Sequence, residues 1–175
     1  MVGLDLDGTL LTDRKEITSR TRKVISRAIE EGVVVLVATG RPWMGVPEEL
    51  RGFPGMRYAL TSNGARILDA QEGIILEEQL LPPDSAKKVL EICGKYDTLQ
   101  EIYFDGQGYA PADKMAKIER YHKNPNMWEY TRKTRIPVDD IFELLEREDR
   151  GVDKVQALFA DMEERRAAWK ELEAE

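Results

Sequence analysis

The sequence predicts an α/β fold built around a parallel β-sheet. Residues 2–4 form a short apolar segment, residues 18–31 have helical periodicity, and residues 33–38 are continuously apolar. A strand, a helix and a fully apolar strand in this order are typical of a right-handed βαβ unit whose second strand is buried. The 175 residues are enough for one ordinary domain, or for a core with a small inserted domain.

The first half of the chain contains clear element boundaries. Thr18 or Ser19 is a suitable N-cap for the first helix, and Gly32 is a suitable residue to end it. The next apolar run, over residues 33–38, is the second strand. The elements expected after it are a short helix over residues 42–52, a strand over 58–62, and a hairpin with strands over 66–68 and 74–76.

The composition changes at residues 80–84, which read Leu-Leu-Pro-Pro-Asp. We therefore place a domain boundary there, with residues 1–81 in one domain and residues 82–175 in the other. The elements expected in the second domain are helices over residues 85–96, 112–122, 139–147 and 161–175 and strands over residues 101–104 and 154–159. This alternation indicates an α+β arrangement.

The charge balance limits the class of partner. Lys and Arg total 26 against 33 Asp and Glu, and the net charge is −7 with no sustained basic block. Nucleic acid is therefore not expected as a partner. An acidic protein also disfavours anionic substrates at long range, so a phosphate site would need a cation or local donors.

The sequence also indicates a cytoplasmic protein with no membrane contact. No apolar run reaches the ~20 residues that span a bilayer, and the first residues do not resemble a signal peptide. The single cysteine, Cys93, permits no intrachain disulfide, which fits a reducing compartment. The single histidine, His122, excludes a histidine-rich zinc site.

Two carboxylates lie two residues apart where an apolar strand meets a glycine turn. In the segment Asp5-Leu6-Asp7-Gly8-Thr9, alternation along a strand would point Asp5 and Asp7 the same way. Two like charges this close repel each other and are costly to desolvate. A divalent cation or a shared proton would offset the repulsion between the two carboxylates. The alternative is a solvated acidic strand end before a turn.

A polar residue, Thr39, also follows the second strand. Because ligands of parallel sheets bind at the carboxyl ends of the strands, Asp5 and Thr39 are expected to share a site. Thr39, Arg41 and the Asn63-Gly64 pair each also have an ordinary structural interpretation. Thr39 could cap a helix, and Arg41 could pair with a carboxylate. Asn63-Gly64 could be a simple turn.

Three segments resemble motifs of the haloacid dehalogenase (HAD) superfamily of phosphotransferases. Residues 5–9 resemble its first motif, and residues 33–42, which end in Thr-Gly-Arg-Pro, resemble its second. Residues 59–65, Ala-Leu-Thr-Ser-Asn-Gly-Ala, resemble the Asn-Gly turn of the Cof-like, type IIB sugar-phosphatase branch. The segments occur in the family's order, and the resemblance covers most of the chain, most strongly through Leu68.

The resemblance implies a fold and an activity. The fold is a HAD-like Rossmannoid core with a parallel sheet in residues 1–81 and an inserted α+β cap in residues 82–175. The activity is that of a Mg²⁺-dependent hydrolase of a small phosphate ester, such as a sugar phosphate, which forms an aspartyl-phosphate. Tyr103, Asp105, Tyr109 and Lys114 are weak candidates for substrate preference in the cap, because ordinary packing explains each of them.

The resemblance also implies site residues. Asp5 is the nucleophile and Asp7 the general acid and base, and both are expected to bind the metal, Asp7 through its backbone carbonyl. Acid catalysis by Asp7 needs a raised pKa, which the nearness of Asp5 would supply. The residues implied in phosphate or substrate binding are Thr39, Gly40, Arg41, Asn63 and Gly64.

Two family motifs are not found. Lys154 precedes a strand of the expected cap and does not match the family's lysine motif, and no strand followed by Gly-Asp appears after the cap. The core is therefore expected to be incomplete, which leaves the strand before Asp5 at a sheet edge that a partner or a homo-oligomer would cover. The alternative to an active enzyme is a catalytically impaired fragment that binds phosphate or oligomerises. A nucleotide-binding module is disfavoured because neither glycine-rich nucleotide motif is present.

Overall fold

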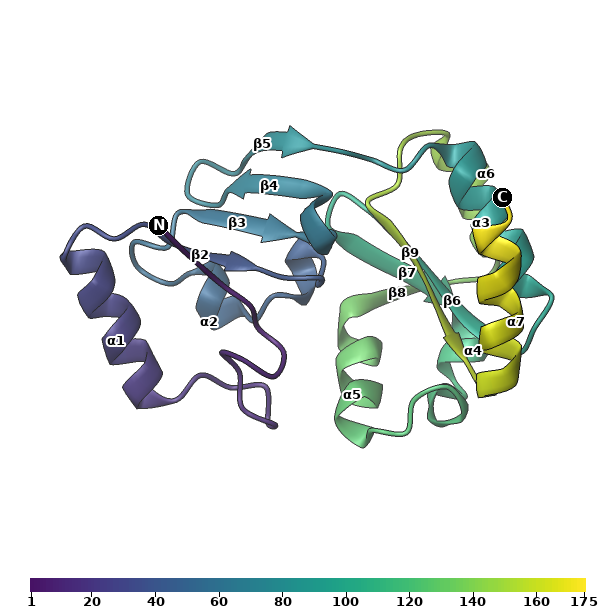
Figure 1. Ribbon diagram of the computed structural model, residues 1–175, viewed down its shortest axis with the longest axis horizontal. Helices are drawn as coiled ribbons and strands as arrows, with labels where there is room; N and C mark the ends of the chain where they lie inside the picture. Colours follow the sequence, from purple (N-terminus) through teal and green to yellow (C-terminus); the bar gives the residue numbers. More distant parts are fainter. The chain divides into compact units, whose positions relative to one another are not determined.

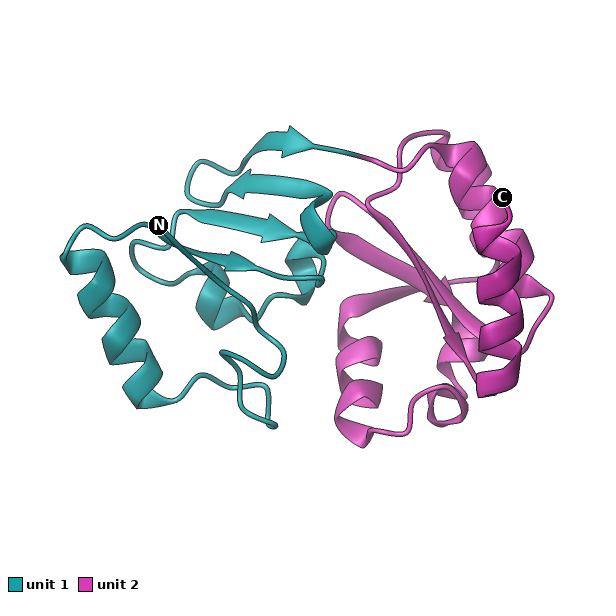
Figure 2. Ribbon diagram, in the orientation of Figure 1, with its two compact units in different colours: residues 1–79 teal, residues 80–175 magenta.

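The computed structural model describes residues 1–175, which divide into two compact units, Met1–Gln79 and Leu80–Glu175 (Figures 1 and 2). The division falls after residue 79, whereas the change in composition places it after residue 81. No helix in either unit combines the length and the apolar character needed to cross a bilayer.

Unit 1 is built on a five-stranded sheet with the order β1-β2-β3-β4-β5. Its elements are β1 (Val2–Leu4), α1 (Ser19–Glu30), β2 (Val35–Ala38), the 3₁₀ turn η1 (Trp43–Gly45), α2 (Glu48–Arg51), β3 (Tyr58–Thr61), the 3₁₀ turn η2 (Ser62–Gly64), β4 (Arg66–Asp69) and β5 (Ile74–Glu78). The first three strands are parallel, and β4 and β5 continue the sheet in antiparallel pairs. The βαβ unit and the hairpin that the sequence predicts are confirmed.

The first helix shows how the sequence sets these elements. The Thr18 side chain caps α1 by accepting a hydrogen bond from the backbone N–H of Thr21, as its position predicts. Gly32 then reverses the chain with a φ of +83° and leads into β2, where Val35 and Val37 are buried. Both valines belong to an apolar core that also includes Leu6, Leu50 and Phe53.

The strand before the first motif lies at the edge of this sheet. β1 pairs only with β2, and Val2 is 45 % exposed. The expectation that this strand has one open edge is therefore confirmed.

Unit 2 is built on a four-stranded sheet with the order β8-β7-β6-β9. Its elements are α3 (Pro83–Gly94), β6 (Thr98–Phe104), β7 (Gln107–Pro111), α4 (Ala112–Met115), the 3₁₀ turn η3 (Ile118–Arg120), α5 (Pro125–Thr134), β8 (Arg135–Val138), α6 (Ile141–Glu148), β9 (Lys154–Phe159) and α7 (Met162–Glu173). Side chains alternate along β6, so Ile102 and Phe104 pack against α3 and α6, while Leu99 packs with Met115 and Ile118.

Unit 2 differs from the sequence prediction in several elements. The helix expected over residues 112–122 is broken into α4 and η3, and β7, α5 and β8 were not expected. Strand β8 contains Pro137, and it is an edge strand that pairs only with β7. An edge position tolerates proline, because one side of the strand needs no N–H donors.

Candidate active site

The three parallel strands deliver the motif residues to one edge of the sheet of unit 1. Leu4 lies opposite Val37, and Ala38 lies opposite Leu60. The residues that follow these strands, including Asp5 and Thr39, therefore leave the sheet at the same edge. The strand pairing supports the expectation that they share a site.

The first motif is a tight turn held by its own backbone. The backbone N–H groups of Leu10 and Leu11 donate to the carbonyls of Asp5 and Leu6 at 3.2 and 2.9 Å. The Leu6 side chain between the two aspartates is fully buried. The Thr9 hydroxyl donates to Oδ2 of Asp5 at 3.2 Å, so the motif orients its own first carboxylate.

The second carboxylate is held by two cations. Arg41 donates to both oxygens of Asp7, Nε to Oδ2 and Nη2 to Oδ1, each at 2.7 Å. Nζ of Lys15 lies 2.6 Å from Oδ1. The hydrogen bonds from Arg41, followed by those from Lys15, hold the pKa of Asp7 at about 2 although partial burial opposes them. The expectation of a raised pKa for Asp7 is therefore wrong in this arrangement, because two cations outweigh the nearness of Asp5.

The second and third motifs are joined by hydrogen bonds. The backbone N–H of Arg41 donates to Oγ1 of Thr39 at 3.2 Å, and the backbone N–H of Asn63 donates to the Thr39 carbonyl at 3.2 Å. A Cβ atom at Gly40 would collide with Oδ1 of Asn63. A side chain at residue 40 would therefore displace the Asn63 amide, which lies against Gly40.

The Asn-Gly turn of the third motif is conformationally demanding. Asn63 has φ +60° and Gly64 has φ +96°, both in the left-handed region. The structure thus brings Thr39, Gly40, Arg41 and Asn63 together, and Gly64 follows Asn63 in the turn.

Sequence reasoning missed two members of this network. Lys15 comes from the polar loop after the first motif, where no pattern distinguished it from its neighbours. The Gly45 carbonyl accepts from Nη1 of Arg41 at 2.9 Å and fixes the guanidinium from its other side. Backbone carbonyls leave no residue-type signal in a sequence.

The donor set fits a magnesium ion in kind. A carboxylate and a backbone carbonyl, as at Asp5 and Asp7, are oxygen ligands of the type that Mg²⁺ prefers. However, no group of three or more acidic, histidine or cysteine side chains is positioned to hold a metal. Both oxygens of the Asp7 side chain are also engaged by Arg41 and Lys15.

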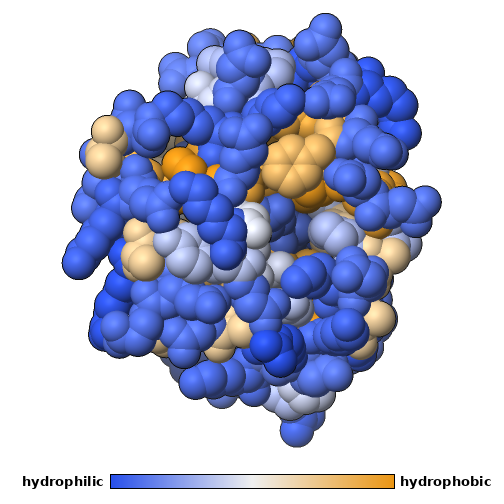
Figure 3. Space-filling view, turned by 90° about the vertical axis from the view of Figure 1, so that its right-hand side faces the viewer, coloured by the Kyte–Doolittle hydropathy of each residue, from blue (hydrophilic) through white to orange (hydrophobic).

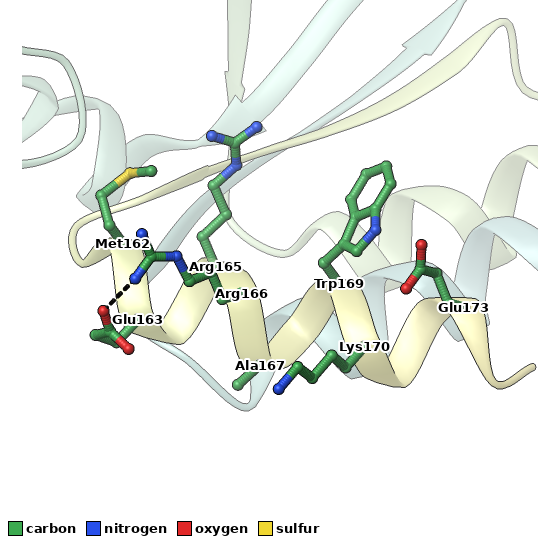
Figure 4. Close-up of a pocket in the computed structure, with 8 residues that line it drawn as sticks. All are labelled: Met162, Glu163, Arg165, Arg166, Ala167, Trp169, Lys170 and Glu173. Atoms are coloured by element: carbon green, nitrogen blue, oxygen red, sulfur yellow. Dashed lines mark hydrogen bonds and ion pairs between the residues drawn. The ribbon is translucent and has the colours of Figure 1, made fainter.

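A separate groove of about 620 Å³ runs along α7 in unit 2. Its lining includes the exposed side chains of Met162 and Trp169, with Arg166 and Glu163 paired at one end (Figure 4). On the side of the molecule that carries α7, hydrophobic residues appear between predominantly hydrophilic ones (Figure 3). None of the predicted site residues lines this groove.

Comparison with known proteins places the chain in a family. The model of the family described as haloacid dehalogenase-like hydrolase matches residues 2–175. The Bacillus subtilis protein YcsE, named a 5-amino-6-(5-phospho-D-ribitylamino)uracil phosphatase, is 32 % identical over 98 residues, which cover 56 % of this chain and 39 % of YcsE. The chain thus matches less than half of the length of this curated relative.

Solved structures agree on the fold. A haloacid dehalogenase-like hydrolase from B. subtilis superposes with a TM-score of 0.79 at 21 % identity, over 98 % of this chain and 65 % of that one. The HAD subclass IIB sugar phosphatase BT4131 superposes with a TM-score of 0.75 at 19 % identity, over 98 % of this chain and 62 % of that one. The chain therefore belongs to the haloacid dehalogenase-like hydrolase family and has the fold of its Cof-like subclass IIB.

Proposed function

We propose that this chain carries the nucleophile and phosphate cradle of a phosphatase that hydrolyses a small phosphate ester, such as a sugar phosphate, through an aspartyl-phosphate. The observation that supports this most directly is the family match over residues 2–175, together with Asp5 and Thr39 at one sheet edge. In this proposal unit 1 is the core and unit 2 is the cap.

The residues of unit 1 have separate roles in this proposal. A carboxylate oxygen of Asp5 attacks phosphorus, and the bond between phosphorus and the ester oxygen breaks. Thr39, Gly40, Asn63 and Gly64 surround the phosphoryl group and offer it a hydroxyl and close backbone approach. A magnesium ion, held by Asp5 and the Asp7 carbonyl, would supply positive charge beside the phosphate.

Asp7 has to change partners to act as an acid. The departing alkoxide needs a proton, and a carboxyl group with a pKa of about 2 is ionised at neutral pH. Arg41 and Lys15 therefore have to release Asp7 before it can protonate the leaving group. In its ionised form Asp7 is suited to the second step, in which it takes a proton from the water that hydrolyses the aspartyl-phosphate.

The proposal is tested by Mg²⁺-dependent phosphate release from a panel of sugar phosphates, with Asp5→Asn and Asp113→Asn in parallel. Asp113 is exposed on α4 and serves as the matched control. We expect turnover by the unchanged protein and by Asp113→Asn, and loss of at least about 100-fold in Asp5→Asn. Turnover that survives in Asp5→Asn would assign the activity to another group or to a contaminant.

A second function is favoured by the closed state of Asp7, whose two carboxylate oxygens are held by Arg41 and Lys15. In this alternative the chain binds phosphate esters without hydrolysing them. Saturable binding of a sugar phosphate, weakened in Thr39→Val, together with no phosphate release at any Mg²⁺ concentration would support binding alone.

A further inference from the structure

β5 ends the sheet of unit 1 on the side opposite β1, and each of its five residues is exposed (Figure 1). Three consecutive residues of this strand are apolar. Ile74, Ile75 and Leu76 are 52, 47 and 48 % exposed, and none of them belongs to the core of unit 1. Side chains of a half-covered strand normally alternate between an apolar buried face and a polar solvated one. β5 does not follow this pattern, so packing within unit 1 does not account for its apolar residues.

The backbone of β5 also has an open side, because the strand pairs only with β4. The register of that pairing shifts by one residue along the strand, so Leu76 has no partner on β4. Residues 75–78 line a groove of about 340 Å³. An edge strand presents N–H and C=O groups with which another extended segment can pair, and apolar side chains beside them add contact area.

The charged residues of β5 and of the turn before it are all acidic. Glu77 and Glu78 end the strand, and Glu72 lies in the turn. Glu78 pairs with Arg66 of β4 at 3.1 Å, whereas the exposed Glu77 has no ion-pair partner. No lysine or arginine occurs over residues 67–86. The open edge therefore carries a free carboxylate and has no cation of its own to offset it.

This charge pattern disfavours a second copy of the chain as the occupant of the edge. Two β5 strands side by side would bring Glu77 and Glu78 of both copies into one short ladder, and neither strand contains a lysine or arginine. Like charges that meet across a ladder destabilise it, and charged residues on an edge strand are one means of preventing self-pairing. An added strand with lysine or arginine between apolar residues would meet the same carboxylates with the opposite charge.

We propose that β5 is a docking site for an extended basic segment of another protein, which adds a strand to the edge of the unit 1 sheet. The backbone of this segment pairs with the open side of β5. Its apolar side chains contact Ile74, Ile75 and Leu76, and a lysine or arginine pairs with Glu77. The docking site contains none of the residues assigned to hydrolysis, so it does not depend on the proposed activity.

The test measures the binding of three fluorescently labelled synthetic peptides to the protein by fluorescence anisotropy. The basic probe is Val-Lys-Val-Lys-Val-Lys and the acidic probe is Val-Glu-Val-Glu-Val-Glu. The third probe has proline in place of the second valine of the basic probe, which keeps its charge and removes an N–H donor. We expect the basic probe to bind at least about tenfold more tightly than either of the others. Equal binding of the basic and proline probes would contradict the addition of a strand.

Charge reversal at Glu77 tests the assigned ion pair. Glu77→Lys should weaken binding of the basic probe at least about tenfold and should strengthen binding of the acidic probe. Glu30→Lys makes the same change of charge at an exposed residue of α1 and is the matched control, which should leave both affinities unchanged. Equal effects of the two variants would assign the binding to net charge instead of β5. Circular dichroism establishes that each variant is folded.

Amide NMR of ¹⁵N-labelled protein locates the bound probe. We expect the largest shift changes at residues 74–78 and none at Leu10 and Leu11 of the first motif. Changes confined to other strands would place the probe elsewhere and refute the assigned site. Sedimentation velocity tests for a second copy, and we expect no dimer that forms through β5. A dimer whose formation shifts the amides of residues 74–78 would make a second copy the occupant and overturn the proposal.

Discussion

Arg41 holds Asp7 through two parallel hydrogen bonds, Nε to Oδ2 and Nη2 to Oδ1, each 2.7 Å long. The pair joins the first two motifs of the chain, and its bidentate geometry is the strongest form of an arginine–carboxylate contact. Arg41 is buried while the Asp7 side chain is 42 % exposed, so the arginine is fixed and the aspartate is the partner that can move.

Replacing Arg41 should release Asp7. In Arg41→Met the pKa of Asp7 should rise from about 2 toward its ordinary value of 3.8, leaving only Lys15 to hold it down. The exposure of Asp7 limits the loss of unfolding free energy from the pair itself to about 1 kcal/mol. Carboxyl ¹³C NMR measures the pKa, and Arg22→Met, which breaks the more exposed pair with Glu49, is the control that should leave Asp7 unchanged.

The same pair predicts how stability depends on pH. The folded-state pKa of Asp7 lies below its ordinary value, so its ionised form stabilises the protein fully above about pH 4. This contribution is lost as the pH falls from there toward 2. Urea unfolding of the unchanged protein and Asp7→Asn should therefore give free energies that differ at pH 6 and converge only below about pH 2. A difference that is constant with pH would contradict the assigned ion pair.

Gly40→Ala should displace the Asn-Gly turn. The added Cβ collides with Oδ1 of Asn63, and we expect a loss of about 1–3 kcal/mol in unfolding free energy. Gly3→Ala is the matched control, because its Cβ would meet Ala38 at an ordinary 3.6 Å. Adding Asn63→Gly to Gly40→Ala should recover most of the loss, since glycine removes the colliding amide and accepts the positive φ of residue 63. Equal losses in the single and double variants would place the strain elsewhere.

Breaking the buried pair of unit 2 should cost much more than breaking a surface pair. Arg135→Met leaves Glu101 charged and buried, and we expect a loss of about 3–5 kcal/mol. Arg132→Met, which removes an exposed partner of Glu119 on the adjacent helix, should cost less than about 1 kcal/mol. Chemical denaturation monitored by circular dichroism gives both values. Adding Glu101→Gln to Arg135→Met should recover stability, and failure to do so would show that the loss comes from packing.

The backbone of unit 1 was predictable from sequence because its signals are local. The hydroxyl cap at Thr18, the glycine after α1 and the apolar run of β2 each act within a few residues, and together they specify a βαβ unit. The motif positions followed from strand ends. The ion pair between Asp7 and Arg41 did not, because the two residues are 34 apart in sequence and only the folded sheet brings them together.

Unit 2 shows the limit of such reasoning. β7, α5 and β8 were not expected. Pro137 masks β8, and the pairing of β8 is decided by β7, which is distant in sequence. The alignment of Arg135, Gly108, Tyr103 and Lys154 across the sheet was equally hidden. These residues come from four strands, and their common register depends on three separate pairings.

The first motif closes on itself through the backbone bonds from Leu10 to Asp5 and from Leu11 to Leu6, with the Leu6 side chain anchored in the core. Its shape is therefore independent of whatever lies on the open side of β1. Hydrogen exchange should report this as slow amides at Leu10 and Leu11 beside a faster-exchanging strand. The loop that carries the Asp5 and Asp7 carboxylates is thus held by its own backbone. Another strand could pair with the open edge of β1, or leave it, without changing the direction in which this loop points.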